Sequence, residues 1–130
     1  MGLSVFVAGG LGALARSVVD SRVGGAWKAR VRGPMRAFPA STFVINVSGA
    51  FVLGIIAGIL IAHDVTGVHR LDAILGVGFL GAYTTFSTEE WQTLGLLRAN
   101  AGVEALNIVG SLAASMLLAA LGIWLGGLTG

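Results

Sequence analysis

The sequence predicts an all-α membrane protein with four transmembrane helices. Of its 130 residues, 55% are hydrophobic and 11% are charged, and the mean hydropathy is +0.89. Soluble domains contain about 25% charged residues, so this chain lies well outside their range. A chain of this length holds about four spans of roughly 20 residues each and little else. We therefore expect residues 1–130 to form a single membrane domain.

The first expected span covers about residues 3–19 and contains one charge, Arg16. A cleaved signal peptide is not expected, because no basic residue precedes the apolar stretch and nothing like a soluble mature domain follows it. Residues 20–38 carry five basic residues together with Trp27, an aromatic residue typical of the membrane interface. We expect this stretch to be a basic loop.

The second span is the clearest one, because residues 40–62 are uncharged and are long enough to cross a bilayer with some tilt. Pro39, just before it, suits the first turn of a helix. The fourth span, about residues 105–125, is also uncharged. Pairs of glycines four residues apart in these two spans are typical of close helix contacts, namely Gly54 with Gly58 and Gly122 with Gly126.

The third span, about residues 71–97, contains a run of small and hydroxyl residues at positions 78–88. Glycine lowers helix stability, and lipid supplies no water to a freed carbonyl or amide. Broken backbone at this depth must therefore be buried in protein or line a cavity, and it usually marks an ion or substrate site. We expect the third helix to be broken near its middle.

The lysines and arginines of the short loops predict the orientation, because these residues resist translocation. The first and third loops would lie on the same side and carry six of them, whereas the second loop carries only Arg70. The protein is therefore expected in the cell membrane as a multi-pass protein, with the basic first loop in the cytoplasm and both termini outside. No nucleic-acid partner is expected.

Polar groups inside spans are costly and often functional. Asn46 in the second span offers two amide donors to an anion, although an interhelical hydrogen bond is an equal alternative. Asn107, Ser111 and Ser115 recur every four residues, which aligns their donors along one face of the fourth helix. Any one serine could simply allow helices to approach closely, but the three residues together indicate a polar track.

The expected break offers two further kinds of group. Phe86 lies between hydroxyl residues, and the partly positive edge of its ring can contact an anion without supplying a full charge. Carbonyls released at Gly81 and Thr84 would instead attract a cation. The residue chemistry thus indicates a small, hard anion and a central cation.

Three short motifs are discounted. Residues 76–81 match a dinucleotide-binding glycine pattern but follow no strand, and residues 46–48 spell a glycosylation acceptor inside an apolar span. His63 and His69 lack a defined third metal ligand. With no cysteine and no converging nucleophile, base and orienting group, the chain is not expected to be an enzyme.

Residues 9–16, 42–51 and 78–88, which read GGLGALAR, TFVINVSGAF and GFLGAYTTFST, closely resemble the Fluc (CrcB) fluoride-channel family. The resemblance covers all four spans in order and spacing. It implies an antiparallel, inverted dimer of four-helix subunits, in which fluoride leaves the cytoplasm passively through two pathways at the subunit interface and so becomes less toxic.

The resemblance also implies roles for individual residues. A structural sodium ion, which is not transported, would be held by carbonyls of Gly81 and Thr84 from both subunits. Arg16 matches the first-span arginine of the family and would anchor the helix or attract anions near the pore. The residues that match pore positions are Asn46, Phe86, Ser111 and Ser115.

Two positions depart from the family pattern. Glu89 stands where a second pore phenylalanine is expected, and its carboxylate would repel fluoride if it faced the pore; Asn107 stands where a tyrosine is usual. These departures, with the strong charge bias, favour a heterodimer with an inverted homologous subunit over a homodimer. A small proton-coupled exporter using Glu89 or Glu90, and a non-conducting support subunit, are the alternatives.

Overall fold

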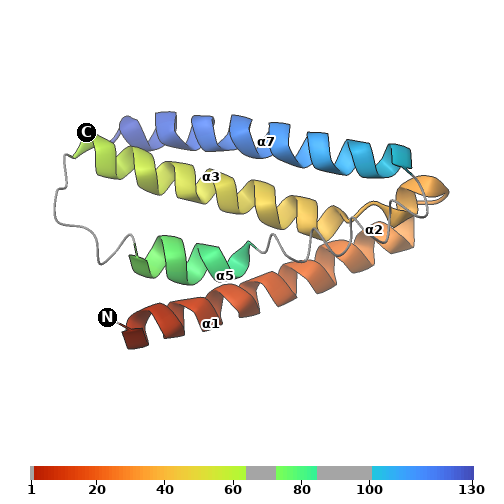
Figure 1. The fold of residues 1–130 in the computed structure, drawn as a ribbon, viewed down its shortest axis with the longest axis horizontal. Coiled ribbons are helices and arrows are strands. Elements are labelled where there is room, and N and C mark those ends of the chain that lie inside the picture. The colour runs from red at the N-terminus through yellow and green to blue at the C-terminus, as the bar shows by residue number, and fades with distance from the viewer. Residues whose placement is uncertain (1, 64–72, 85–100) are drawn as a thin grey trace.

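The computed structural model describes residues 2–63, 73–84 and 101–130 (Figure 1). All regular secondary structure in these ranges is helical. Three helices are long and apolar enough to cross a membrane, at Gly2–Arg30, Ala40–Ala62 and Ala101–Gly127. The chain is thus built as a multi-pass membrane protein. The expected third span, residues 71–97, falls only partly within the described residues.

The first helical segment is longer than the sequence suggested. It consists of α1 (Gly2–Val19), a π-helical turn η1 (Asp20–Gly24) and α2 (Gly25–Arg30), joined without interruption. The expectation of a loop from residue 20 was therefore wrong for residues 20–30. Polar composition alone does not end a helix, and residues 25–30 are mostly good helix formers.

The basic segment leaves helical geometry only at Val31, which is extended with φ −93° and ψ 137°. Gly33 follows with a positive φ of 70°, and Pro34 starts a short 3₁₀ turn, η2 (Pro34–Ala37). Glycine tolerates this left-handed region, and proline cannot continue the hydrogen bonding of the preceding helix. The turn returns the chain to the membrane.

The helices α3 (Ala40–Ala62) and α7 (Ala101–Gly127) run parallel, side by side (Figure 1). Glycines allow the close approach. A Cβ atom on Gly54 would overlap the Ala119 carbonyl, and one on Gly58 would overlap the Ile123 carbonyl. From the other side, a Cβ atom on Gly122 or on Gly126 would lie 2.8 Å from a backbone nitrogen of α3. The prediction that these four glycines form helix contacts is confirmed.

The described part of the third segment consists of a π-helix, η3 (Ala73–Leu80), and a final helical turn, α5 (Gly81–Tyr83). It packs against α1, because a Cβ atom on Gly12 would overlap the Phe79 carbonyl and one on Gly78 would lie 2.9 Å from the Val5 carbonyl. Helical geometry ends after Tyr83.

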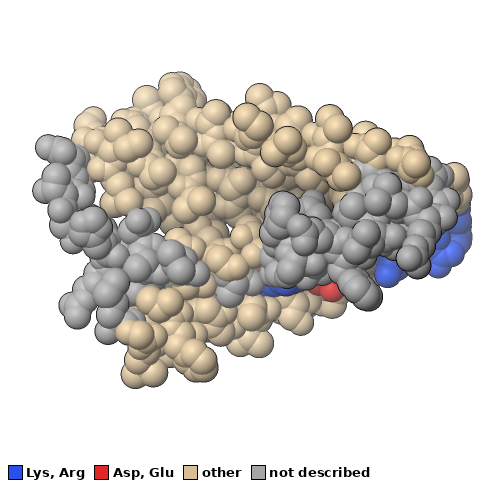
Figure 2. Space-filling model, viewed as in Figure 1, with Lys and Arg blue, Asp and Glu red and all other residues tan. Residues whose placement is uncertain are grey.

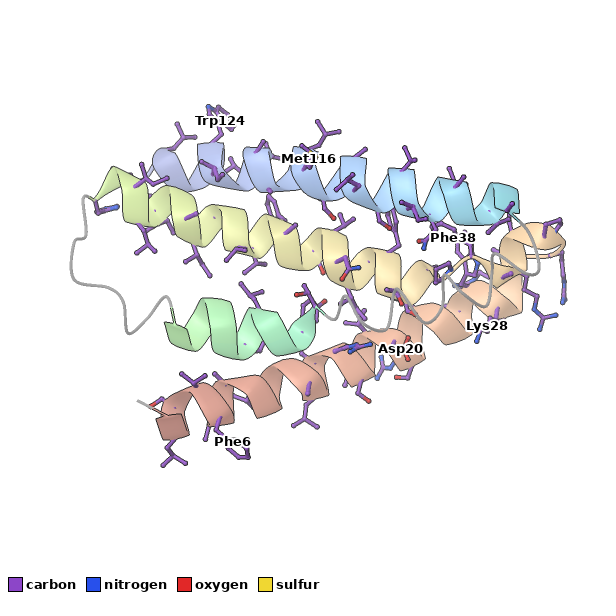
Figure 3. All side chains as sticks on the ribbon, viewed as in Figure 1. Phe6, Asp20, Lys28, Phe38, Met116 and Trp124 are labelled. Atoms are coloured by element: carbon purple, nitrogen blue, oxygen red, sulfur yellow. The ribbon has the colours of Figure 1, made fainter. Side chains whose placement is uncertain are left out.

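The helices form two layers, with α3 and α7 in one and α1 with η3 and α5 in the other (Figure 1). The two layers run in opposite directions, and both termini lie at one end of the molecule. Lys and Arg gather at the opposite end (Figure 2). Apolar side chains such as Phe6 and Met116 point outward (Figure 3), with 79% and 66% of their surface exposed.

Candidate functional site

The polar face of α7 contains the most deeply buried polar side chain in the described part of the protein. Asn107 is fully buried, with 0% of its surface exposed, and Ser111 one turn later is 6% exposed. The Ser111 hydroxyl donates a hydrogen bond to Asn107 Oδ1 at 3.4 Å. Ser115, a further turn along, is half-buried. The helical spacing that predicted one face is therefore observed.

Asn107 Nδ2 is buried and has no hydrogen-bond partner within the described residues. Leaving a buried donor unsatisfied costs about 1–3 kcal/mol. The amide therefore favours any acceptor that can reach it, and an anion would accept a stronger hydrogen bond from one of its N–H groups than a neutral group would. The Ser111 bond turns the amide oxygen toward Ser111, and the amide nitrogen is the group left without a partner among the described residues.

A second polar contact joins α3 to the third segment. Ser48 Oγ lies 3.0 Å from the Tyr83 hydroxyl, and it also donates to the Ile45 carbonyl at 3.2 Å. Either hydroxyl can donate in the Ser48–Tyr83 contact, and Tyr83 is the donor when the single Ser48 proton goes to the Ile45 carbonyl. Sequence reasoning missed this pair. Tyr83 is the only tyrosine of the chain, and a tyrosine hydroxyl within a membrane needs a partner, which was the available signal.

Thr84 ends the described helical turn. Its backbone N–H and its hydroxyl both donate to the Leu80 carbonyl, at 2.8 and 2.9 Å, while its own backbone is extended at φ −88° and ψ 128°. Its methyl group packs directly over Gly49, where a Cβ atom would overlap it. The end of the helix is thus positioned by α3.

Gly81 lies in the last helical turn and is exposed in the single chain. A Cβ atom there would lie 3.7 Å from the Gly76 carbonyl, an ordinary contact, so packing within this chain does not require a glycine at that position. The last carbonyls of a helix lack partners within it and carry the negative end of its dipole. The cation site at the carbonyls of Gly81 and Thr84 stays a prediction.

Asn46 is half-buried on α3. A Cβ atom on Gly110 would lie 3.9 Å from the Phe43 ring, which sets the register of the two parallel helices. Three residues after Phe43, Asn46 falls at the depth of α7 between Ser111 and Ser115, because parallel helices rise equally per residue. Arg16 is half-buried in the last turn of α1.

Two predicted site residues, Phe86 and Glu89, lie outside the described residues. The others fall into two groups. Asn46, Asn107, Ser111 and Ser115 belong to the layer of α3 and α7, whereas Gly81 and Thr84 belong to the layer that α5 shares with α1. The contacts at Ser48 and Gly49 connect the two groups.

Comparison with known proteins identifies relatives along nearly the whole chain. Residues 3–123 match the family model described as CrcB-like protein, Camphor Resistance (CrcB). A protein from Leifsonia xyli subsp. xyli named fluoride-specific ion channel FluC 1 is 42% identical over 127 residues, which cover 97% of this chain and 86% of the relative. The fluoride-specific ion channel FluC of Acidobacterium capsulatum is 40% identical over 129 residues, covering 98% and 94%. FluC 2 of Mycobacterium tuberculosis is 36% identical over 124 residues, covering 95% and 88%.

Proposed function

The chain belongs to the CrcB-like family, and from that premise we propose that it is a subunit of a fluoride-specific ion channel that lets fluoride leave the cytoplasm passively. It is an ion-transport protein and not an enzyme. The observation within this chain that carries the proposal is the fully buried Asn107 amide, whose nitrogen meets no acceptor among the described residues while its oxygen accepts from Ser111.

Fluoride is a small, strongly hydrated anion, so a pathway must replace its water with hydrogen-bond donors. The side chains of Asn107, Ser111 and Ser115 lie about 6 Å apart in rise along α7. The Ser111 proton, which bonds to Asn107 Oδ1 in this structure, would turn toward an anion that passes from the Asn107 amide to Ser115. Asn46 adds an amide at the depth of the two serines. Phe86, which lies outside the described residues, would supply a ring edge to the same pathway.

The single chain buries Asn107 and Ser111 but leaves the rest of the track partly open, so a second subunit would complete it. Ser115 is half-buried and Gly81 is exposed in the single chain, which suits both to a subunit interface. We place the third span at about residues 71–97 and pair the subunit with an inverted partner. With termini at one end and basic residues at the other, the basic segment would face the cytoplasm and both termini the outside.

A structural sodium ion would lie between the two subunits. Gly81 and Thr84 fit such an ion, because both are at the end of a helix, where carbonyl groups are unpaired and the dipole favours positive charge. Two carbonyls from each subunit form a more complete oxygen shell than either pair alone. The ion would hold the interface together and would not move with fluoride.

The partner would be a homologous subunit rather than an identical copy. Glu89 would repel fluoride if it faced the pathway, and Asn107 replaces a residue that the family usually has as tyrosine. One subunit with a weakened set of pore side chains can be complemented by an inverted homologue with a complete set. Arg16 would attract anions toward the pathway.

Fluoride efflux from liposomes tests this proposal. Vesicles loaded with fluoride and containing the purified chain, its coexpressed homologue, or both are followed with a fluoride electrode, with empty vesicles as the control. The proposal expects efflux that is fastest for the pair and independent of a proton gradient. Efflux that requires the gradient would indicate an exporter, and silence in every combination would contradict channel activity.

A further inference from the structure

The continuous helix Gly2–Arg30 is longer than a bilayer core is thick. At about 1.5 Å of rise per residue, its 29 residues extend about 43 Å. The hydrocarbon core of a bilayer is about 30 Å thick. Since the apolar part of the helix begins near residue 3, α2 at the far end must lie at the depth of the lipid headgroups.

The residues at that depth are strongly basic. Asp20 is the only acidic residue between positions 20 and 38, and its Oδ1 accepts a hydrogen bond from Ser41 Oγ at 2.6 Å. All five basic side chains of the same stretch are exposed, and this end of the molecule carries the Lys and Arg surface seen in Figure 2. They are Arg22, Lys28, Arg30, Arg32 and Arg36.

A row of aromatic rings holds this basic segment in place. Trp27 Nε1 donates to the Met35 carbonyl at 3.0 Å, which folds η2 back onto α2. The rings of Trp27 and Phe38 are 5.8 Å apart, and those of Phe38 and Phe43 are 5.7 Å apart. The basic segment is therefore attached to the first turns of α3. Figure 3 shows Lys28 and Phe38 at the same end of the molecule.

We propose that this end of the protein binds the headgroups of anionic phospholipids. We call it the headgroup surface and define it by Trp27, Lys28, Arg30, Arg32 and Arg36. Guanidinium groups bind phosphate through paired hydrogen bonds, and basic residues next to a membrane span are attracted to an anionic leaflet. Trp27 supplies the amphipathic ring that favours the same depth.

Free phosphate offers the same chemistry as a lipid headgroup, but the location favours the lipid. The surface is fixed to a membrane-spanning helix at headgroup depth, so anionic lipids meet it at high local concentration. The binding proposed here does not depend on the fluoride pathway, because none of the residues proposed for that pathway belongs to the headgroup surface. The two proposals can fail separately.

Quenching of Trp27 fluorescence by brominated lipids tests the proposal in the full chain. A variant with Trp27 as its only tryptophan, made by Trp91→Phe with Trp124→Phe, is reconstituted into vesicles of phosphatidylcholine containing either brominated phosphatidylglycerol or brominated phosphatidylcholine. We expect the apparent affinity for phosphatidylglycerol to be at least about fivefold higher, and to fall at high salt because the charges are screened. Equal quenching by the two lipids would overturn the proposal.

Neutralising the surface should remove the preference. The full variant combines Lys28→Gln, Arg30→Gln, Arg32→Gln and Arg36→Gln in the same background. A milder variant, Arg30→Gln with Arg36→Gln, is expected to lose part of the preference and serves if the full variant does not fold. A preference that survives in the folded variants would contradict the assignment.

Two controls separate the sources of the signal. A chain with Trp124 as its only tryptophan reports from the other end of the molecule (Figure 3), and it should show no lipid preference. Inorganic phosphate added at constant ionic strength should not displace the brominated phosphatidylglycerol. If phosphate abolishes the preference and chloride does not, the surface is a site for soluble phosphate and the lipid proposal is wrong.

Discussion

Ser111 Oγ donates a hydrogen bond to Asn107 Oδ1 inside the buried face of α7, while the Asn107 amide nitrogen has no partner among the described residues. The serine thereby orients the amide, because the N–H groups lie on the side of the planar group away from the oxygen that Ser111 holds. The hydrogen bond between the two side chains thus holds the amide N–H groups in one orientation.

Asn107→Leu is expected to lower fluoride efflux strongly while the protein stays folded. The change removes an unsatisfied amide nitrogen but also the acceptor of the buried Ser111 hydroxyl, so it should lower the free energy of unfolding by no more than about 1–3 kcal/mol. Liposome fluoride efflux should fall at least about tenfold, as expected when about 1.4 kcal/mol of anion stabilisation is lost. Ile108→Leu, on the exposed side of the same turn, is the matched control and should leave efflux unchanged. Efflux equal to the parent in a folded Asn107→Leu protein would contradict a role in the pathway.

The contact between the Thr84 methyl group and Gly49 predicts that a substitution at Gly49 impairs activity and that a second substitution at Thr84 restores it. Gly49→Ala forces the Thr84 methyl group away, and the hydroxyl bond to Leu80 limits how Thr84 can rotate. We expect the rate of fluoride efflux to fall by about tenfold and the sodium concentration needed for half-maximal efflux to rise by about tenfold. A tenfold change corresponds to about 1.4 kcal/mol.

Adding Thr84→Ser to the same chain removes the methyl group and keeps the hydroxyl, so activity should return. If the double variant is no better than Gly49→Ala alone, the contact does not position the helix end.

The hydrogen bond between Ser48 and Tyr83 should be measurable as a coupling energy. Tyr83→Phe and Ser48→Ala are each expected to lower the free energy of unfolding by about 0.5–1.5 kcal/mol. In a double-mutant cycle the coupling should be about 0.6 kcal/mol, the size typical of such bonds in membrane proteins. Unfolding of the four proteins in mixed micelles provides the measurement, and strictly additive effects would count against the bond.

Glycine contacts between α3 and α7 predict a sharp difference between two similar substitutions. Gly58→Ala places a methyl group on the Ile123 carbonyl and should destabilise the protein by about 1–3 kcal/mol. Gly127→Ala meets no atom within 4 Å and improves helix propensity, so it should be neutral or stabilising. Apparent melting temperatures in detergent should order the variants accordingly. Equal melting temperatures would show that the helices do not need the glycine.

Much of the candidate site could be predicted from local patterns. The four-residue spacing of Asn107, Ser111 and Ser115 places them on one face of any α-helix, whatever surrounds it. The glycine pairs of α3 and α7 indicated close contact for an equally local reason, since small residues every four positions form a groove. The extent of the first helix was not predictable in this way, because charged residues are common in helices that leave the bilayer.

The sequence by itself determined that this chain crosses a membrane and which face of its last helix is polar, because hydrophobicity and helical periodicity are properties of neighbouring residues. Only the tertiary structure decided that the Asn107 amide nitrogen lacks a partner among the described residues. It also decided that the hydroxyl of Tyr83 bonds to Ser48, 35 positions earlier, and that the Thr84 methyl group packs on Gly49. These outcomes depend on which helix faces meet and at what register. The close packing of α3 with its neighbours determines which faces meet and at what register, and a pattern among neighbouring residues cannot predict either.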